Sequence, residues 1–82
     1  MVRKSFSGLE VVKALVSWGF VPTGGNGSHR VLRYQHPENP DDVRDVVVPL
    51  HDRIKEGTLR NIAEQAGANN FYEFCRTLDK KL

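Results

Sequence analysis

The chain has 82 residues, of which 39% are hydrophobic and 27% charged, and it carries a formal net charge of +2. This length accommodates one domain, and the composition is that of a globular protein, which excludes a disordered or fibrous chain. The longest apolar stretch, residues 14–21, is far shorter than the ~20 residues that span a bilayer, and the N-terminus lacks the apolar run of a signal peptide. We therefore expect a cytoplasmic protein without a membrane segment.

The charges are unevenly distributed along the chain. Residues 1–35 hold five basic residues and a single acidic one, whereas acidic residues outnumber basic ones in the remainder. A basic first half favours a polyanionic ligand bound through phosphate contacts, although a mixed solvated surface is as common for so small an asymmetry. The single cysteine, Cys75, has neither a CxxC partner nor nearby histidines, so we expect no metal site and no cofactor.

The first predicted element is a helix over residues 9–18. Ser7 and Glu10 have the spacing of a capping box, in which the serine oxygen accepts from a free helix amide and the glutamate accepts from the serine amide. Apolar residues cover a broad face of this helix, which predicts that it is mostly buried. Gly19 ends the helix, and residues 20–23 follow as a first strand.

A predicted sheet follows this helix. Pro22 favours an edge position for the first strand, and the glycine-rich residues 24–27 predict a hairpin turn. Residues 28–35 alternate imperfectly as a second strand, and the pattern leaves open which of its faces meets the core. After a polar loop over residues 36–42 comes a third strand, residues 44–50, whose three consecutive valines favour a central position.

Two more helices complete the pattern. Leu59 to Ala66 and Phe71 to Leu78 both repeat apolar residues at helical spacing, the first stopped by Gly67 and the second started by Asn70 as its N-cap. The order α-β-β-β-α-α predicts an α+β fold with a three-stranded antiparallel sheet and helices packed on one face.

Three histidines are candidates for chemistry. His36 lies in the loop beside a proline, where a solvated side chain without a role is expected. His51 follows the third strand, where a structural role in the turn is favoured over a functional one. His29 differs because it follows Gly27 and Ser28 at the point where the turn enters the second strand. The alternative interpretation is that these three residues only connect the hairpin turn to the strand and have no function in chemistry.

The surroundings of His29 suit phosphodiester chemistry. Gly27 lets a substrate approach the backbone, Ser28 supplies a hydroxyl and an amide, and Arg30 and Arg33 have the charge to neutralise a phosphate. Imidazole both accepts and donates a proton near neutral pH, and RNA cleavage needs a base, an acid and positive charge on the phosphorane.

Five segments, in their order and spacing, resemble the HicA family of bacterial and archaeal mRNA interferase toxins. They are Gly19-Phe20, Gly27-Ser28-His29, Val48-Pro49-Leu50-His51, Gly57-Thr58-Leu59-Arg60-Asn61-Ile62 and Gln65-Ala66-Gly67. The resemblance implies that residues 1–82 form a single HicA-like domain with a fold like the double-stranded-RNA-binding domain. It also implies a type II toxin that acts as a metal-independent endoribonuclease on mRNA and is inhibited by a HicB-like antitoxin.

Carried over residue by residue, the catalytic histidine of the family falls on His29, with Gly27, Ser28 and His51 in supporting positions. Family members often have Arg or Lys directly before Gly-Ser-His, whereas this chain has Gly24-Gly25-Asn26. RNA contacts are therefore expected from Lys4, Arg30 and Arg33. The loop over residues 36–43 is acidic and longer than a tight hairpin, so we expect it to face away from RNA or to contact the partner.

Two other functions remain open at the level of sequence. A non-catalytic RNA-binding module is the first, because the double-stranded-RNA-binding fold mainly recognises shape and phosphates. An interaction domain that binds no nucleic acid is the second. Cleavage, salt-dependent binding and absence of binding at low salt separate the three.

Overall fold

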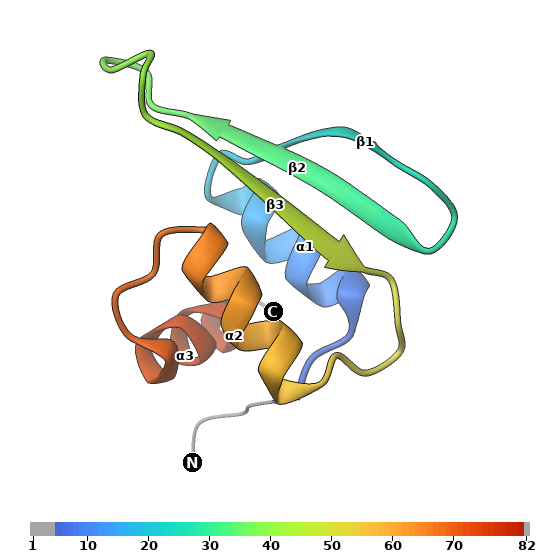
Figure 1. Cartoon of the computed structure of the whole chain (residues 1–82). Coiled ribbons are helices and arrows are strands. Elements are labelled where there is room, and N and C mark those ends of the chain that lie inside the picture. Colours follow the sequence, from blue (N-terminus) through green and yellow to red (C-terminus); the bar gives the residue numbers. More distant parts are fainter. Residues whose placement is uncertain (1–4, 82) are drawn as a thin grey trace.

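The computed structural model describes residues 5–81 (Figure 1). Its elements follow the predicted order of one helix, three strands and two helices. They are α1 (Gly8–Ser17), β1 (Val21–Gly25), β2 (His29–Gln35), β3 (Val43–Pro49), α2 (Glu56–Gln65) and α3 (Phe71–Lys80). The three strands form one antiparallel sheet, so the predicted α+β class is confirmed. None of the helices within residues 5–81 is long and apolar enough to cross a membrane.

The ends of α1 form as their residues predict. The Ser7 hydroxyl accepts from the Glu10 amide at 3.1 Å, and the Glu10 carboxylate accepts from the Ser7 amide at 2.9 Å, which completes the capping box. Gly19 has a φ of +97°, a left-handed conformation that glycine adopts without a steric penalty. The chain therefore leaves α1 sharply and turns back into β1.

The order of the strands is β1-β2-β3, so β2 is central and β3 lies at an edge. The prediction of a central third strand was wrong. Val46 and Val48 are fully buried, but Val47 between them is 44% exposed, because only one face of the sheet is covered. At the free edge of β3, the Val47 amide donates to Gln65 Oε1 of α2 at 3.2 Å. The valine run thus reflects one buried face and an edge protected by a helix.

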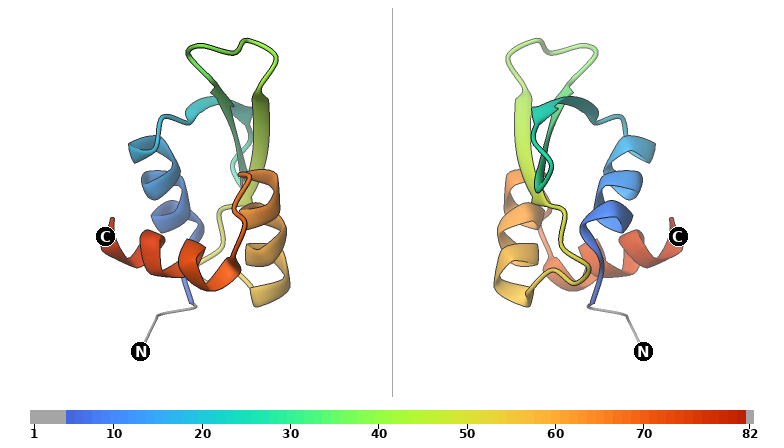
Figure 2. Two further views of the ribbon diagram at one scale, coloured as in Figure 1. Left: turned by 90° about the vertical axis from the view of Figure 1, so that its left-hand side faces the viewer. Right: turned by 90° about the vertical axis from the view of Figure 1, so that its right-hand side faces the viewer.

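One apolar cluster joins the sheet to all three helices. Leu32, Val46 and Val48 point from the sheet into this cluster, toward Val11, Ala14 and Leu15 of α1. Figure 2 shows the helices beside and below the sheet, with the loop between β2 and β3 projecting beyond them. The helix α1 is less buried than predicted, since Leu9 is 70% and Val16 46% exposed. Only part of the apolar surface of α1 is buried, because the helix packs against the sheet on one side alone.

The start of α1 is packed directly against the end of β3. The Gly8 amide donates to the His51 carbonyl at 2.9 Å, and a side chain at Gly8 would collide with the Pro49 carbonyl. Glycine is therefore needed here for a close approach between backbones. This contact fixes where the chain goes after β3, and it places His51 beside the N-terminus of α1.

Candidate active site

The Gly27-Ser28-His29 segment lies where the first hairpin enters β2. His29 is the first residue of β2 and pairs with Pro49, the last residue of β3. The pairing extends one step further, because the Leu50 amide donates to the Ser28 carbonyl at 2.7 Å. The register therefore brings His29 and His51 to the same end of the sheet, although 21 positions separate them in the sequence.

Asn26 holds the turn before His29 in place. Its Oδ1 accepts from the Ser28 amide at 2.8 Å and from the His29 amide at 3.0 Å. The backbone N–H of Asn26 in turn donates to the His29 carbonyl at 2.9 Å. Asparagine side chains commonly organise turns in this way by bonding to backbone amides two residues on. Sequence reasoning treated Asn26 only as a residue that tolerates a turn and missed this function.

Two glycines of the first hairpin differ in what they do. The predicted turn over residues 24–27 was too long, because Gly24 and Gly25 pair with β2 as the last residues of β1. Gly25 has a φ of +124°, and a side chain there would collide with the His29 carbonyl. Gly27 has no such φ, and a side chain there would meet open space. The fold thus requires glycine at position 25 and not at position 27. The space beside Gly27 is open, so a ligand is able to approach the backbone closely there.

The His29 side chain is exposed and forms one hydrogen bond. Its Nδ1 lies 3.1 Å from the Ser28 hydroxyl, while no residue of the described part of the chain bonds to its Nε2. His51 is also exposed, and its ring has no hydrogen bond within residues 5–81. Over the same range, no three His, Cys, Asp or Glu side chains gather at one point. His29 therefore presents a free ring nitrogen to solvent.

The predicted RNA-binding arginines differ in their surroundings. Arg33 donates to the Asp45 carboxylate through Nε at 2.8 Å and Nη2 at 3.2 Å. The hydrogen bond from Arg33 lowers the pKa of Asp45, and the same hydrogen bond and the charge of Asp45 raise the pKa of Arg33. Arg30 forms no ion pair within residues 5–81. Lys4, the third predicted contact, lies outside the described residues.

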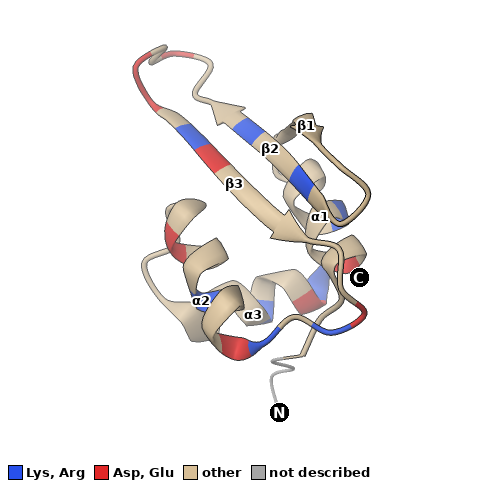
Figure 3. Ribbon diagram, turned by 45° about the vertical axis from the view of Figure 1, so that its right-hand side comes forward, with Lys and Arg blue, Asp and Glu red and all other residues tan. Residues whose placement is uncertain are grey.

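The two strand faces separate these cations. His29 and Arg33 project from one face of β2, because residues two and four apart share a face. Arg30 projects from the other face, since it pairs with the buried Val48. Figure 3 shows the basic residues on β2 and the acidic residues in the loop beyond its far end. The sheet end at His29 is therefore the more suitable end for a phosphate.

The helix-free face of the sheet that bears His29 is mostly apolar. Val31 lies directly opposite Val47, and Gln35 lies opposite Val43. Between these two pairs, the Arg33–Asp45 ion pair has Val21 on its β1 side. We call this surface the valine face: Val21, Val31, Val43 and Val47. Three of these valines are at least 40% exposed. An exposed apolar patch of this kind is typical of a protein contact surface.

A hollow in the described surface lies away from this site. This hollow of about 660 Å³ lies between the sheet, the connection from α2 to α3, and α3, and it is lined by the aromatic residues Trp18, Phe20, Tyr34 and Phe74. His36 lines this hollow, whereas His29 does not. His29 combines a ring nitrogen that no described residue occupies with a position fixed by Asn26. A polymer that lies across an open surface does not need an enclosed cavity.

Comparison with protein families identifies the class to which this fold and site belong. A family model described as "HicA toxin of bacterial toxin-antitoxin" matches residues 8–68. The protein is thus of the toxin class in bacterial toxin–antitoxin systems, and the chain belongs to the HicA toxin family. The family implies an antitoxin partner and an RNA target. Searches of curated proteins and of solved structures found no match.

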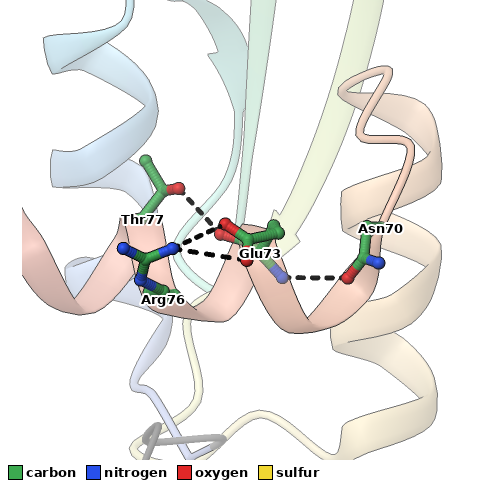
Figure 4. A network of polar contacts seen from close by, with 4 residues as sticks. All are labelled: Asn70, Glu73, Arg76 and Thr77. Atoms are coloured by element: carbon green, nitrogen blue, oxygen red, sulfur yellow. Dashed lines mark hydrogen bonds and ion pairs between the residues drawn. The ribbon is translucent and has the colours of Figure 1, made fainter.

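The matched range contains every described candidate site residue and ends before α3. This helix has its own N-cap, because Asn70 Oδ1 accepts from the Glu73 amide at 3.0 Å (Figure 4). The Glu73 carboxylate also accepts from Arg76 at 3.1 Å, and the Thr77 hydroxyl donates to the Glu73 carbonyl at 2.7 Å. The buried face of α3 belongs to the same core cluster as α1 and the sheet.

Proposed function

We propose that this HicA family member is a metal-independent endoribonuclease that cleaves mRNA in the cytoplasm, with His29 as its catalytic residue. The observation that carries the proposal is the free Nε2 of an exposed histidine, held on a turn that Asn26 fixes. The open backbone at Gly27 lets an RNA strand approach this ring. We further propose that residues 1–82 act as a single HicA-like domain, since α3 shares the common core.

The proposed reaction uses the 2′-hydroxyl of RNA as nucleophile. Nε2 of His29 takes the 2′-hydroxyl proton, the 2′-oxygen bonds to phosphorus, and the bond from phosphorus to the 5′-oxygen breaks. Water protonates the leaving 5′-oxygen, and the imidazolium returns its proton to solvent. The products are one RNA ending in a 2′,3′-cyclic phosphate and one beginning with a free 5′-hydroxyl.

The phosphate needs positive charge as the phosphorane develops. Arg30 forms no ion pair within residues 5–81, but it projects from the opposite face of β2 to His29, so it adds positive charge near this strand end and not a direct contact with the reacting phosphate. Arg33 lies on the same face as His29 and contributes when phosphate replaces Asp45 as its partner. In this proposal Lys4 adds a backbone contact, and His51 supports the site from the end of β3.

We propose that a HicB-like antitoxin inhibits the protein by covering the valine face together with His29. The face is uncharged apart from the mutually neutralised Arg33 and Asp45, so it suits an apolar protein surface better than a phosphate backbone. His29 lies at the end of this face, two residues from Val31 on the same strand. A partner seated there blocks access of RNA to the ring.

The test incubates purified full-length protein with a long mRNA and excess EDTA. We expect fragments with cyclic phosphate ends from the wild-type protein and none above background from His29→Ala. Binding that weakens steeply with salt but never shortens the RNA supports a non-catalytic RNA-binding module instead. Absence of RNA binding at low salt supports an interaction domain. Cleavage that requires a divalent cation contradicts the metal-independent reaction.

A further inference from the structure

We infer that Asn26 and Ser28 hold neutral His29 in the tautomer that is protonated at Nδ1, so that Nε2 carries the lone pair. Asn26 and Ser28 are positioning residues in this scheme, because they act on RNA only through His29. The inference rests on the proposed function, because the proposed reaction selects between the two directions of the Ser28 hydroxyl that the distances allow. The tautomer itself is a property of the free protein and is measurable without RNA.

The side-chain amide of Asn26 has two ends, an oxygen and a nitrogen, that have to be told apart first. Two backbone amides, those of Ser28 and His29, donate to the same side-chain atom at 2.8 and 3.0 Å. Only an oxygen accepts such bonds, so Oδ1 and not Nδ2 faces the turn. The atom that lies 3.0 Å from the Ser28 hydroxyl is therefore an acceptor without a hydrogen of its own.

The Ser28 hydroxyl has one hydrogen and two neighbours. Asn26 Oδ1 lies 3.0 Å from the Ser28 oxygen, and His29 Nδ1 lies 3.1 Å from it. When the hydroxyl donates to Asn26, its oxygen accepts from a protonated Nδ1. When it donates to His29 instead, Nδ1 is the acceptor and the ring proton sits on Nε2. The direction of one hydroxyl thus corresponds to one or the other tautomer.

The proposed reaction uses only the first arrangement. A base at Nε2 needs its lone pair there, so the ring proton must be on Nδ1. After the base has taken a proton, both ring nitrogens are donors, and Ser28 must again accept. In both states the serine hydrogen has to point elsewhere, and Asn26 Oδ1 is the acceptor within reach. The hydroxyl therefore keeps one orientation through the proton transfer, with no reorganisation at the moment of reaction.

His36 gives the same molecule an internal comparison. Its Nδ1 lies 3.0 Å from the Glu38 amide nitrogen, which is a donor only. Neutral His36 must therefore accept at Nδ1 and carry its proton on Nε2. The two histidines, one at each end of β2, are expected to be opposite tautomers in a single sample.

The experiment labels the histidine rings with ¹⁵N and ¹³C and records their NMR chemical shifts in alkaline solution, where imidazole is neutral. We expect the Nδ1–H form for His29 and the Nε2–H form for His36. Ser28→Ala removes the hydroxyl but keeps both backbone bonds to Asn26. In this variant His29 is expected to shift toward the Nε2–H form, with His36 unchanged.

Kinetics of the full-length protein supply the second measurement. Ser28→Ala is expected to lower kcat about 3- to 10-fold with little change in KM, the effect of one hydrogen bond made to the reacting side chain. Asn26→Asp keeps an oxygen acceptor for Ser28 and is expected to retain the Nδ1–H form. A merely structural turn residue would not move the tautomer equilibrium of a neighbouring ring.

The outcomes separate this inference from the proposed function. Wild-type His29 in the Nε2–H form overturns the inference, as does a Ser28→Ala variant that retains Nδ1–H. If the wild-type protein never cleaves RNA, the proposed function fails, and the NMR shifts still decide the tautomer. If RNA is cleaved but kcat of Ser28→Ala equals that of the wild type, the positioning function of Ser28 is refuted.

Discussion

The two ends of β2 each carry an exposed histidine, and the two sites differ in what surrounds the ring. His29 is the first residue of the strand, and its Nδ1 faces the Ser28 hydroxyl, which is able to accept a hydrogen bond. His36 follows the strand, and its Nδ1 faces the Glu38 amide, which is only able to donate. The chemistry of a histidine is thus decided by the group at Nδ1, because that group selects which nitrogen carries the lone pair.

The charges at the two ends reinforce this difference. The loop beyond His36 contains Glu38, Asp41 and Asp42, whose charges repel a phosphate backbone. The turn before His29 contains no acidic residue, and Arg30 follows it. Of two similar hairpin ends, only the one at His29 therefore combines a free Nε2 with a surface that tolerates RNA.

The largest expected effect is that of replacing His29 by alanine, with the same replacement at His36 as the comparison. His29→Ala should lower the cleavage rate by about 10²- to 10⁴-fold, the usual contribution of general acid–base catalysis. His36→Ala, the matched control, should leave the rate unchanged. Single-turnover cleavage of one labelled mRNA and thermal unfolding of both variants provide the measurement. Equal loss of activity in the two variants would remove the distinction between the ends.

Alanine substitutions at Gly25 and Gly27 should differ in their effect on the stability of the protein. Gly25→Ala forces a positive φ on alanine and a collision with the His29 carbonyl, which should lower the free energy of unfolding by about 1–3 kcal/mol. Gly27→Ala, the control within the same turn, has open space for its methyl group. We expect an unchanged Tm for that variant and a higher KM for RNA. A similar Tm loss in both would contradict the separate functions of these glycines.

The valine face should respond to a buried charge only in the complex. Val47→Asp should weaken antitoxin binding by at least about 10-fold, because the carboxylate would be desolvated against the partner without a counter-ion. Val16→Asp on α1 is matched in exposure, 46% against 44%, and should bind normally. Calorimetric titration with the antitoxin measures both. Normal binding by Val47→Asp would place the interface elsewhere.

The Arg33–Asp45 pair should give the smallest effect. Asp45 has a lowered pKa in the folded state, so it contributes stability above its ordinary pKa of ~4 and loses this contribution as the pH falls through the lower folded value. The Tm difference between wild type and Asp45→Asn should therefore vanish in acid. This pair is exposed, so the difference at neutral pH is small.

The same variant tests the contribution of Arg33 to RNA binding. Asp45→Asn releases the guanidinium, so the dependence of RNA affinity on salt should steepen by about one phosphate contact. An unchanged slope would mean that Arg33 contributes equally with or without Asp45, or not at all. Arg33→Ala distinguishes these cases, because it should flatten the slope only if Arg33 binds phosphate.

The sequence by itself determined the order of the elements and several of their ends. The capping box at Ser7 and Glu10, the left-handed Gly19 and the Asn70 cap all formed where their residue types predicted. These features depend on hydrogen bonds and steric limits within four residues, so neighbouring side chains suffice to specify them. His29 was also singled out from the residues beside it, and its catalytic function stays a prediction.

Tertiary structure decided everything that depends on distant partners. Val46, Val47 and Val48 are the same residue type, and the helices bury two of them and leave the third exposed because they cover only one face of the sheet. The register of β2 and β3 joins Arg33 to Asp45 and brings His51 near His29. Gly25 and Gly27 differ only in the backbone that surrounds them. Such choices depend on strand order and register, which bring together residues that no local pattern relates.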